Sequence, residues 1–153
     1  IHLLGNHEDM MLQVMIDDDD VTHWVRNGGD KTFQSYGVNL MSGYSLDCVL
    51  PESHKRFLSS LTLYHEEDGF LFVHAGIRPG VALQEQTKMD LLWIRDEFLM
   101  SQEDFGKIVV HGHTIYPTPE IRFNRIGIDT GAWRSDVLTC LILDDHERYF
   151  LST

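Results

Sequence analysis

Long apolar stretches are absent from this sequence. Its apolar runs, such as Phe70–Val73 and Ile108–Val110, are only a few residues long, whereas a membrane-spanning helix needs about 20 apolar residues. The chain also opens without the basic region and apolar stretch of a secretory signal. We therefore expect a cytoplasmic protein with no membrane partner.

Basic residues and cysteines are also scarce. The chain has 12 Lys and Arg against 24 Asp and Glu, a net charge of −12, so it repels nucleic-acid phosphates and anionic membranes, and we expect neither as a partner. Its two cysteines, Cys48 and Cys140, are far apart and form no CxxC pair. We expect each to pack as a small buried residue in a reducing compartment, with no disulfide and no metal.

Repeats and low-complexity linkers are absent as well. A chain of 153 residues with 42% hydrophobic and 24% charged residues is typical of one globular domain. The first residue is Ile1 and not a methionine. We take this as a first indication that the chain is part of a longer one.

The residue pattern predicts a mixed α/β protein whose strands concentrate toward the end of the chain. Asn27-Gly28-Gly29 predicts a turn, and Asp17–Asp20 a solvated loop, which we favour over a calcium site. Apolar spacing predicts helices at Glu8–Ile16, Asp30–Tyr36 and Pro51–Leu63, and a helix or irregular turn at Lys88–Met100. Strands are predicted at Gly69–Val73, Lys107–Val110, Arg122–Ile128, Val137–Leu143 and Arg148–Leu151.

Three short segments each place a potential metal ligand after an apolar run and beside a glycine. They are Leu3-Leu4-Gly5-Asn6-His7-Glu8, Phe72-Val73-His74-Ala75-Gly76 and Val109-Val110-His111-Gly112-His113-Thr114. Imidazole nitrogens and an amide oxygen suit Mn, Fe or Zn, and a neighbouring glycine lets the backbone turn sharply. One such histidine is more often structural, but three segments together predict a metal site at strand ends.

These segments resemble motifs of the calcineurin-like metallophosphoesterases, in particular the bacterial serine/threonine protein phosphatases. Gly5-Asn6-His7-Glu8 is similar to their G-N-H-E motif, Val73-His74-Ala75-Gly76 to V-H-A-G, and Gly112-His113-Thr114 to G-H-T. Asp90–Arg95 and Ile128–Ala132 also match that branch in order and spacing. The resemblance covers nearly the whole chain. It implies a four-layer αββα sandwich of two mixed β-sheets flanked by helices, with residues 1–153 as the C-terminal portion of a single domain.

The resemblance also implies roles for individual residues. Asn6, His74 and His113 match three ligands of the second of two metals. His7 matches the histidine that protonates the leaving group, although an orienting role is the alternative. Arg95 matches an arginine that binds the substrate phosphate, and an ion pair with Asp96 or Glu97 is the alternative.

Two further residues keep open roles. We interpret His111 as structural or as a group that supports the ligands from behind. Asp129 either holds a ligand histidine by a hydrogen bond or caps a turn before Gly131.

In the wider superfamily a second histidine follows in G-H-x-H, and Ile115 stands at that position here. This favours the branch of protein phosphatases and dinucleoside tetraphosphatases.

Two motifs that the family carries upstream, G-D-x-H-G and G-D-x-x-D-R-G, do not occur in the chain. They supply the first metal's ligands, a bridging aspartate and a second phosphate arginine. We therefore expect the N-terminal part of the domain to be missing and the 153 residues alone to have little or no activity.

The intact protein is expected to bind two divalent ions, with Mn²⁺ as the first expectation and Fe or Zn as alternatives. It would act as a phosphoserine/phosphothreonine phosphatase on a phosphoprotein. A symmetrical dinucleoside tetraphosphatase with a nucleotide substrate and a non-catalytic remnant are the alternatives.

Overall fold

The computed structural model describes residues 1–16, 21–38, 46–144 and 147–153, and the predicted loop at 17–20 lies outside them. The chain forms two compact units, Ile1–Thr62 and Leu63–Thr153. The prediction that both belong to a single domain stays a prediction. Among the described residues, no helix is both long and apolar enough to cross a membrane.

The first unit consists of short helices around an apolar core. They are α1 (Asn6–Ile16), α2 (Val21–Trp24), the π-helical turn η2 (Val25–Gly29), α3 (Asp30–Ser35), α4 (Leu46–Val49) and α5 (Glu52–Ser59). Met11 and Val14 of α1 are buried as their spacing predicts. The predicted turn appears as a kink at η2, where Gly28 has φ 92°. Helix α5 ends earlier than predicted, and Thr62 instead forms a parallel bridge with Leu3.

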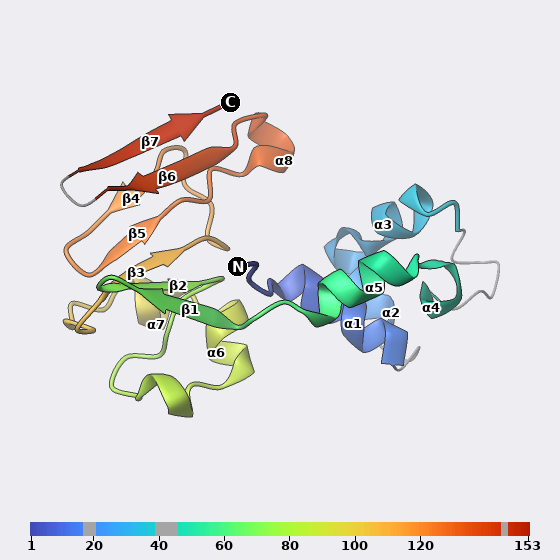
Figure 1. The fold of residues 1–153 in the computed structure, drawn as a ribbon, viewed down its shortest axis with the longest axis horizontal. Helices are drawn as coiled ribbons and strands as arrows, with labels where there is room; N and C mark the ends of the chain where they lie inside the picture. The colour runs from blue at the N-terminus through green and yellow to red at the C-terminus, as the bar shows by residue number, and fades with distance from the viewer. Residues whose placement is uncertain (17–20, 39–45, 145–146) are drawn as a thin grey trace. The chain divides into compact units, whose positions relative to one another are not determined.

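The second unit contains a five-stranded mixed sheet and a two-stranded antiparallel sheet (Figure 1). The larger sheet has the order β1-β2-β3-β5-β4, and β6 pairs with β7. The strands are β1 (Tyr64–Glu67), β2 (Phe70–Val73), β3 (Ile108–His111), β4 (Glu120–Ile121), β5 (Arg125–Gly127), β6 (Thr139–Leu143) and β7 (Arg148–Ser152). The predicted strand at Arg122–Ile128 is therefore shorter, because the Arg122 amide donates to the Arg125 carbonyl in the turn that joins β4 to β5.

Helices fill the connection between the parallel strands β2 and β3. They are the 3-10 helix η4 (Leu83–Glu85), α6 (Lys88–Trp93) and α7 (Asp96–Leu99), while α8 (Ala132–Ser135) follows β5. Parallel strands require such a crossover. The segment predicted as a helix or irregular turn at Lys88–Met100 is two helices, because the backbone leaves helical geometry at Ile94 and Arg95. Their apolar faces and β2 and β3 share a core that includes Val73, Leu91 and Phe98.

The mixed α/β architecture predicted from the sequence is confirmed, with a mixed sheet and flanking helices. The second sheet is antiparallel and not mixed within the described residues. The expectation of buried cysteines is wrong, because both Cys48 and Cys140 are exposed free thiols. Cys140 lies on β6. Successive side chains of a strand point to opposite faces of the sheet, so an apolar residue on a strand need not be buried.

Candidate metal and phosphate site

Three parallel strands of the second unit carry the predicted polar residues at their carboxyl ends. His74 follows β2, His111 ends β3 with His113 just beyond it, and Asp129 lies two residues after β5. Strand β3 lies between β2 and β5 and pairs in parallel with both (Figure 1). Parallel strands end at one edge of the sheet, so this register brings the three segments together. Such edges are where α/β proteins build binding sites.

His74 and His113 are in direct contact. Nε2 of His74 lies 3.2 Å from Nδ1 of His113, and the ring centroids are 5.0 Å apart. Both residues are partly buried. The Trp93 ring meets His113 edge to face at 5.8 Å. The structure thus brings together two residues that lie 39 positions apart in the sequence.

The separation of these nitrogens fits two ligands of one metal ion. A histidine nitrogen lies about 2.1 Å from Zn²⁺, so nitrogens 3.2 Å apart subtend about 100° at a shared ion. That angle lies between octahedral and tetrahedral values. A hydrogen bond between the two rings accounts for the same distance. Among the described residues, no group of three or more His, Cys, Asp or Glu side chains is placed to hold a metal, so the pair is a partial ligand set.

The backbone of His113 adopts an uncommon conformation. Its φ is 61°, in the left-handed region that non-glycine residues rarely occupy. We expected glycines beside the ligands to make the sharp turns, and Gly76 does so with φ 154°. At the third segment the histidine itself takes the left-handed geometry, and Gly112 does not. Strained residues of this kind cluster at functional sites.

Arg95 reaches the same place from the connection between α6 and α7. Its backbone has φ −133° and ψ −98°, and its exposed side chain turns toward the histidine segment. Nη1 donates to the His113 carbonyl at 3.3 Å and to Thr114 Oγ1 at 3.0 Å. These two bonds use both hydrogens of Nη1. Within the described residues, no hydrogen bond or ion pair uses the Nε and Nη2 edge of Arg95, which is the fork that binds two phosphate oxygens.

The sequence left open an ion pair between Arg95 and Asp96 or Glu97. Glu97 instead pairs with Nη1 of Arg78. Two residues of this region had no predicted role. Thr114 is the last residue of the G-H-T segment, and no sequence pattern singles out Arg78.

His111 is buried behind the site. It is 1% exposed, its Nδ1 lies 3.1 Å from the Gly112 carbonyl, and Phe98 meets its ring edge to face at 5.0 Å. Gly127 is so close that an added Cβ would lie 3.3 Å from the ring. Burial lowers the pKa of the His111 imidazole, and the nearby Arg125 charge adds to this effect. These contacts fit the structural interpretation of His111, and a role in supporting the ligands stays a prediction.

Asp129 forms the turn that was one of its two predicted roles. Oδ1 accepts a hydrogen bond from the Gly131 amide at 2.9 Å, and its carbonyl accepts one from the Tyr116 amide at 3.0 Å. Its other oxygen, Oδ2, would lie 3.9 Å from a Cβ added to Gly112. The carboxylate therefore lies beside the backbone of the His111–His113 segment.

Asn6 and His7 belong to the first unit, where they open helix α1. Asn6 is 3% exposed, whereas His7 is exposed. Glu8 stabilises the start of this helix, because its Oε2 accepts a hydrogen bond from the Gly5 amide at 3.1 Å. The metal role of Asn6 and the acid role of His7 stay predictions from the sequence.

Comparison with known proteins gives a result at the level of the fold. No protein-family model and no curated protein match this sequence. Among solved structures, the chain is similar to a crystal structure of "a putative diadenosine tetraphosphatase", with a TM-score of 0.69 and 16% identity over 98% of this chain and 67% of that one. At this identity the likeness concerns the fold alone. The chain therefore shares its mixed α/β fold with that structure.

Proposed function

We propose that this chain is part of a metal-dependent hydrolase that cleaves phosphoester or phosphoanhydride bonds. The observation that carries the proposal is the convergence of His74, His113 and Arg95 at one edge of the parallel strands. The histidine pair offers two nitrogen ligands for a divalent ion, and the arginine beside it offers a fork for phosphate oxygens. A metal ligand set next to a phosphate-binding group is what such a reaction requires.

Each of these side chains has a definite task in the proposed reaction. When bound, the divalent ions lower the pKa of a water molecule and neutralise charge on the phosphoryl oxygens. His74 and His113 would hold one of the ions through their ring nitrogens. Arg95 is anchored through Nη1 to the His113 carbonyl and Thr114. Its Nε and Nη2 donors then bind two phosphoryl oxygens and stabilise the charge that builds there in the transition state.

The remaining parts of the machinery rest on the sequence resemblance. They include Asn6 as a third ligand, His7 as the acid that protonates the leaving group, and two ions per intact site, Mn²⁺ first. Even with Asn6 as a third ligand, the chain would supply ligands for only one of the two ions, without the carboxylates that the resemblance places in the upstream motifs. We therefore propose that the 153-residue chain by itself has little or no hydrolase activity.

Two substrate classes are supported by different observations. The order of Asp90–Arg95 and Ile128–Ala132 favours phosphoserine or phosphothreonine in a protein. The fold similarity to a structure described as a diadenosine tetraphosphatase favours a dinucleoside polyphosphate. The anchored, exposed Arg95 argues against a non-catalytic remnant, because packing does not require it.

The decisive experiment compares the 153-residue chain with the product of its reading frame extended upstream of Ile1. Both are assayed with Mn²⁺ on p-nitrophenyl phosphate, a phosphopeptide and diadenosine tetraphosphate. We expect the upstream residues to carry the two absent motifs and only the longer product to be active. Robust turnover by the 153-residue chain would contradict the proposal that its site is incomplete. A longer product that carries both motifs and hydrolyses none of the three would refute the proposed function.

A further inference from the structure

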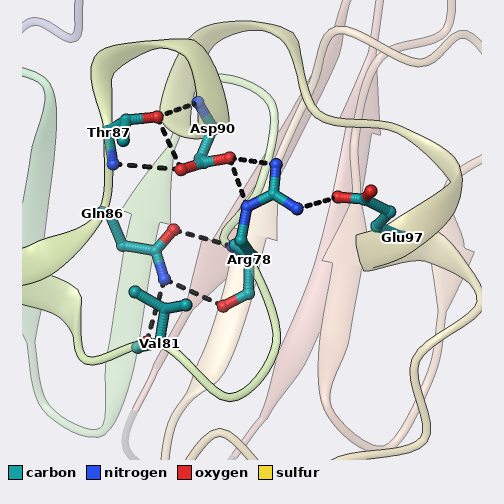
Figure 2. A network of polar contacts seen from close by, with 6 residues as sticks. All are labelled: Arg78, Val81, Gln86, Thr87, Asp90 and Glu97. Carbon is teal, nitrogen blue, oxygen red and sulfur yellow. Dashed lines mark hydrogen bonds and ion pairs between the residues drawn. The ribbon is translucent and has the colours of Figure 1, made fainter.

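Arg78 joins the loop after β2 to both helices of the following crossover. Its Nε and Nη2 donate to Oδ1 of Asp90 in α6 at 2.8 and 2.7 Å, and its Nη1 pairs with the carboxylate of Glu97 in α7. Figure 2 shows the guanidinium between the two carboxylates. We call the group Arg78, Gln86, Thr87, Asp90 and Glu97 the Arg78 clamp.

The Asp90 end of the clamp is buried and held by several hydrogen bonds. Asp90 is 4% exposed, and its second oxygen, Oδ2, accepts bonds from the Thr87 amide at 3.1 Å and from Thr87 Oγ1 at 2.6 Å. The Asp90 amide donates back to Thr87 Oγ1 at 3.2 Å. This reciprocal capping box begins α6 at a defined residue. Both Asp90 oxygens are thus occupied, one by the helix start and one by Arg78.

The backbone of Arg78 is fixed as well. Gln86 Oε1 accepts a bond from the Arg78 amide at 2.8 Å, and its Nε2 donates to the carbonyls of Arg78 and Val81, each at 2.9 Å. The side-chain amide therefore closes the loop that carries the guanidinium (Figure 2). A guanidinium held at both ends in this way keeps a defined direction, which suits a positioning role.

The clamp spans the place where the chain turns to present Arg95. Asp90 precedes Arg95 by five residues and Glu97 follows it by two, and the backbone at Arg95 is not helical. Glu97 is also one of the two carboxylates with which an exposed Arg95 could form an ion pair. Because Arg78 already binds Glu97, the phosphate-binding edge of Arg95 is not taken by it.

We propose that Arg78 is a positioning residue for Arg95. By holding Asp90 and Glu97 it fixes both sides of the turn, and it removes Glu97 as a competitor for the Arg95 guanidinium. The proposal rests on the proposed function, in which Arg95 binds the phosphoryl group. On this proposal, the loop Arg78-Pro79-Gly80 contributes to substrate binding through Arg95.

The kinetic test uses the longer, active product with Mn²⁺ and a double-mutant cycle. Misplacing a binding group can cost up to about 100-fold, and we expect Arg78→Ala to lower kcat/KM about tenfold and Arg95→Ala about 100-fold. The double variant should match Arg95→Ala, because Arg78 acts only through Arg95. Arg122→Ala, which removes an exposed pair with Glu120, is the matched control and should leave kcat/KM unchanged. Equal losses from Arg78→Ala with and without Arg95 would overturn the proposal.

A rescue variant separates positioning from a loss of stability. If Glu97 captures Arg95 once Arg78 is gone, Arg78→Ala/Glu97→Ala should regain most of the lost kcat/KM. A purely structural Arg78 predicts no such recovery. Should Arg78→Ala not fold, Arg78→Lys keeps the charge and loses the fork. It should show a smaller loss that Glu97→Ala again relieves, and absence of that relief would count against the proposal.

A binding measurement on the 153-residue chain needs no activity. Inorganic phosphate is titrated while the Arg95 Nε–Hε signal is followed by NMR. We expect the signal to respond in the wild type and to need about tenfold more phosphate in Arg78→Ala, matching the kinetic loss. An equal response in both would refute the positioning role. No response in either, with the kinetic cycle also silent at Arg95, would instead refute the phosphate role of Arg95 and hence that part of the proposed function.

Discussion

Nε2 of His74 lies 3.2 Å from Nδ1 of His113, across the carboxyl ends of two adjacent parallel strands. The contact joins the two histidine motifs of this unit, Val73–Gly76 and Gly112–Thr114. The distance fits two ligands of one ion, and Arg95 donates to the backbone of one of them.

The first prediction concerns metal binding by the histidine pair. His74→Ala or His113→Ala should each weaken binding of Mn²⁺ or Zn²⁺ to the chain by about tenfold or more, because losing even a supporting group costs about 10–100-fold. Calorimetric titration of each variant measures the change. His54→Ala is the control, since His54 belongs to α5 of the first unit and its Nδ1 contacts the Tyr36 hydroxyl there. Unaltered binding in both variants would exclude the pair as ligands.

The second prediction concerns the left-handed backbone of His113, where φ is 61°. This conformation costs a non-glycine residue about 1–2 kcal/mol. His113→Gly should therefore be more stable than His113→Ala by about 1 kcal/mol in urea unfolding. At His65, within strand β1, the order should reverse, because glycine weakens an ordinary strand. If alanine were the more stable replacement at both sites, the strain assigned to His113 would be wrong.

The third prediction contrasts two glycines beside the histidines. A Cβ added to Gly76 would lie 2.3 Å from the Phe98 ring, so Gly76→Ala should destabilise the chain by about 2–3 kcal/mol through overpacking. A Cβ added to Gly112 would meet its nearest neighbours at 3.7 Å, so Gly112→Ala should change stability little. Thermal unfolding distinguishes the two. Similar losses at both positions would contradict the packing described around Phe98.

The fourth prediction concerns acid stability and Asp90. Burial opposes the charge on this carboxylate, but hydrogen bonds from Thr87 and Arg78 hold its pKa below the ordinary value of 3.8. A lowered folded-state pKa contributes stability that is present above the ordinary value and lost as pH falls through the folded-state pKa. Asp90→Asn should therefore cost about 1–2 kcal/mol at pH 7 and flatten the loss of stability in acid. Stability is measured by urea unfolding across pH 2–7.

The control for Asp90 is Asp68→Asn, an exposed residue in the turn between β1 and β2. This variant should keep the acid dependence of the wild type. If the free energy of unfolding of Asp90→Asn fell with pH as steeply as that of Asp68→Asn, the Arg78 clamp would not be a source of stability.

Local patterns in the sequence determined the elements that carry the site. Apolar runs placed the strands that end near His74 and His113 within one or two residues of their observed ends, because a strand boundary depends on residues close in sequence. The same patterns predicted Lys88–Met100 as a helix or irregular turn and did not place the break at Ile94 and Arg95. They also predicted buried cysteines wrongly, since the face of a strand that a partner covers is not a local property.

The tertiary structure decided which of these residues meet. The order β2-β3-β5 depends on pairing between strands far apart in the chain, and it is this order that sets Nε2 of His74 beside Nδ1 of His113. The left-handed geometry at His113 and the use of Asp129 Oδ1 in a turn depend likewise on the surrounding packing. The ion pairs of Arg78 with Asp90 and Glu97 also depend on this packing, because the three side chains meet only when the crossover folds back onto the sheet. The positions of the strands and their ends follow from short-range preferences of the residues. The distances between side chains follow from long-range packing, which no local pattern encodes.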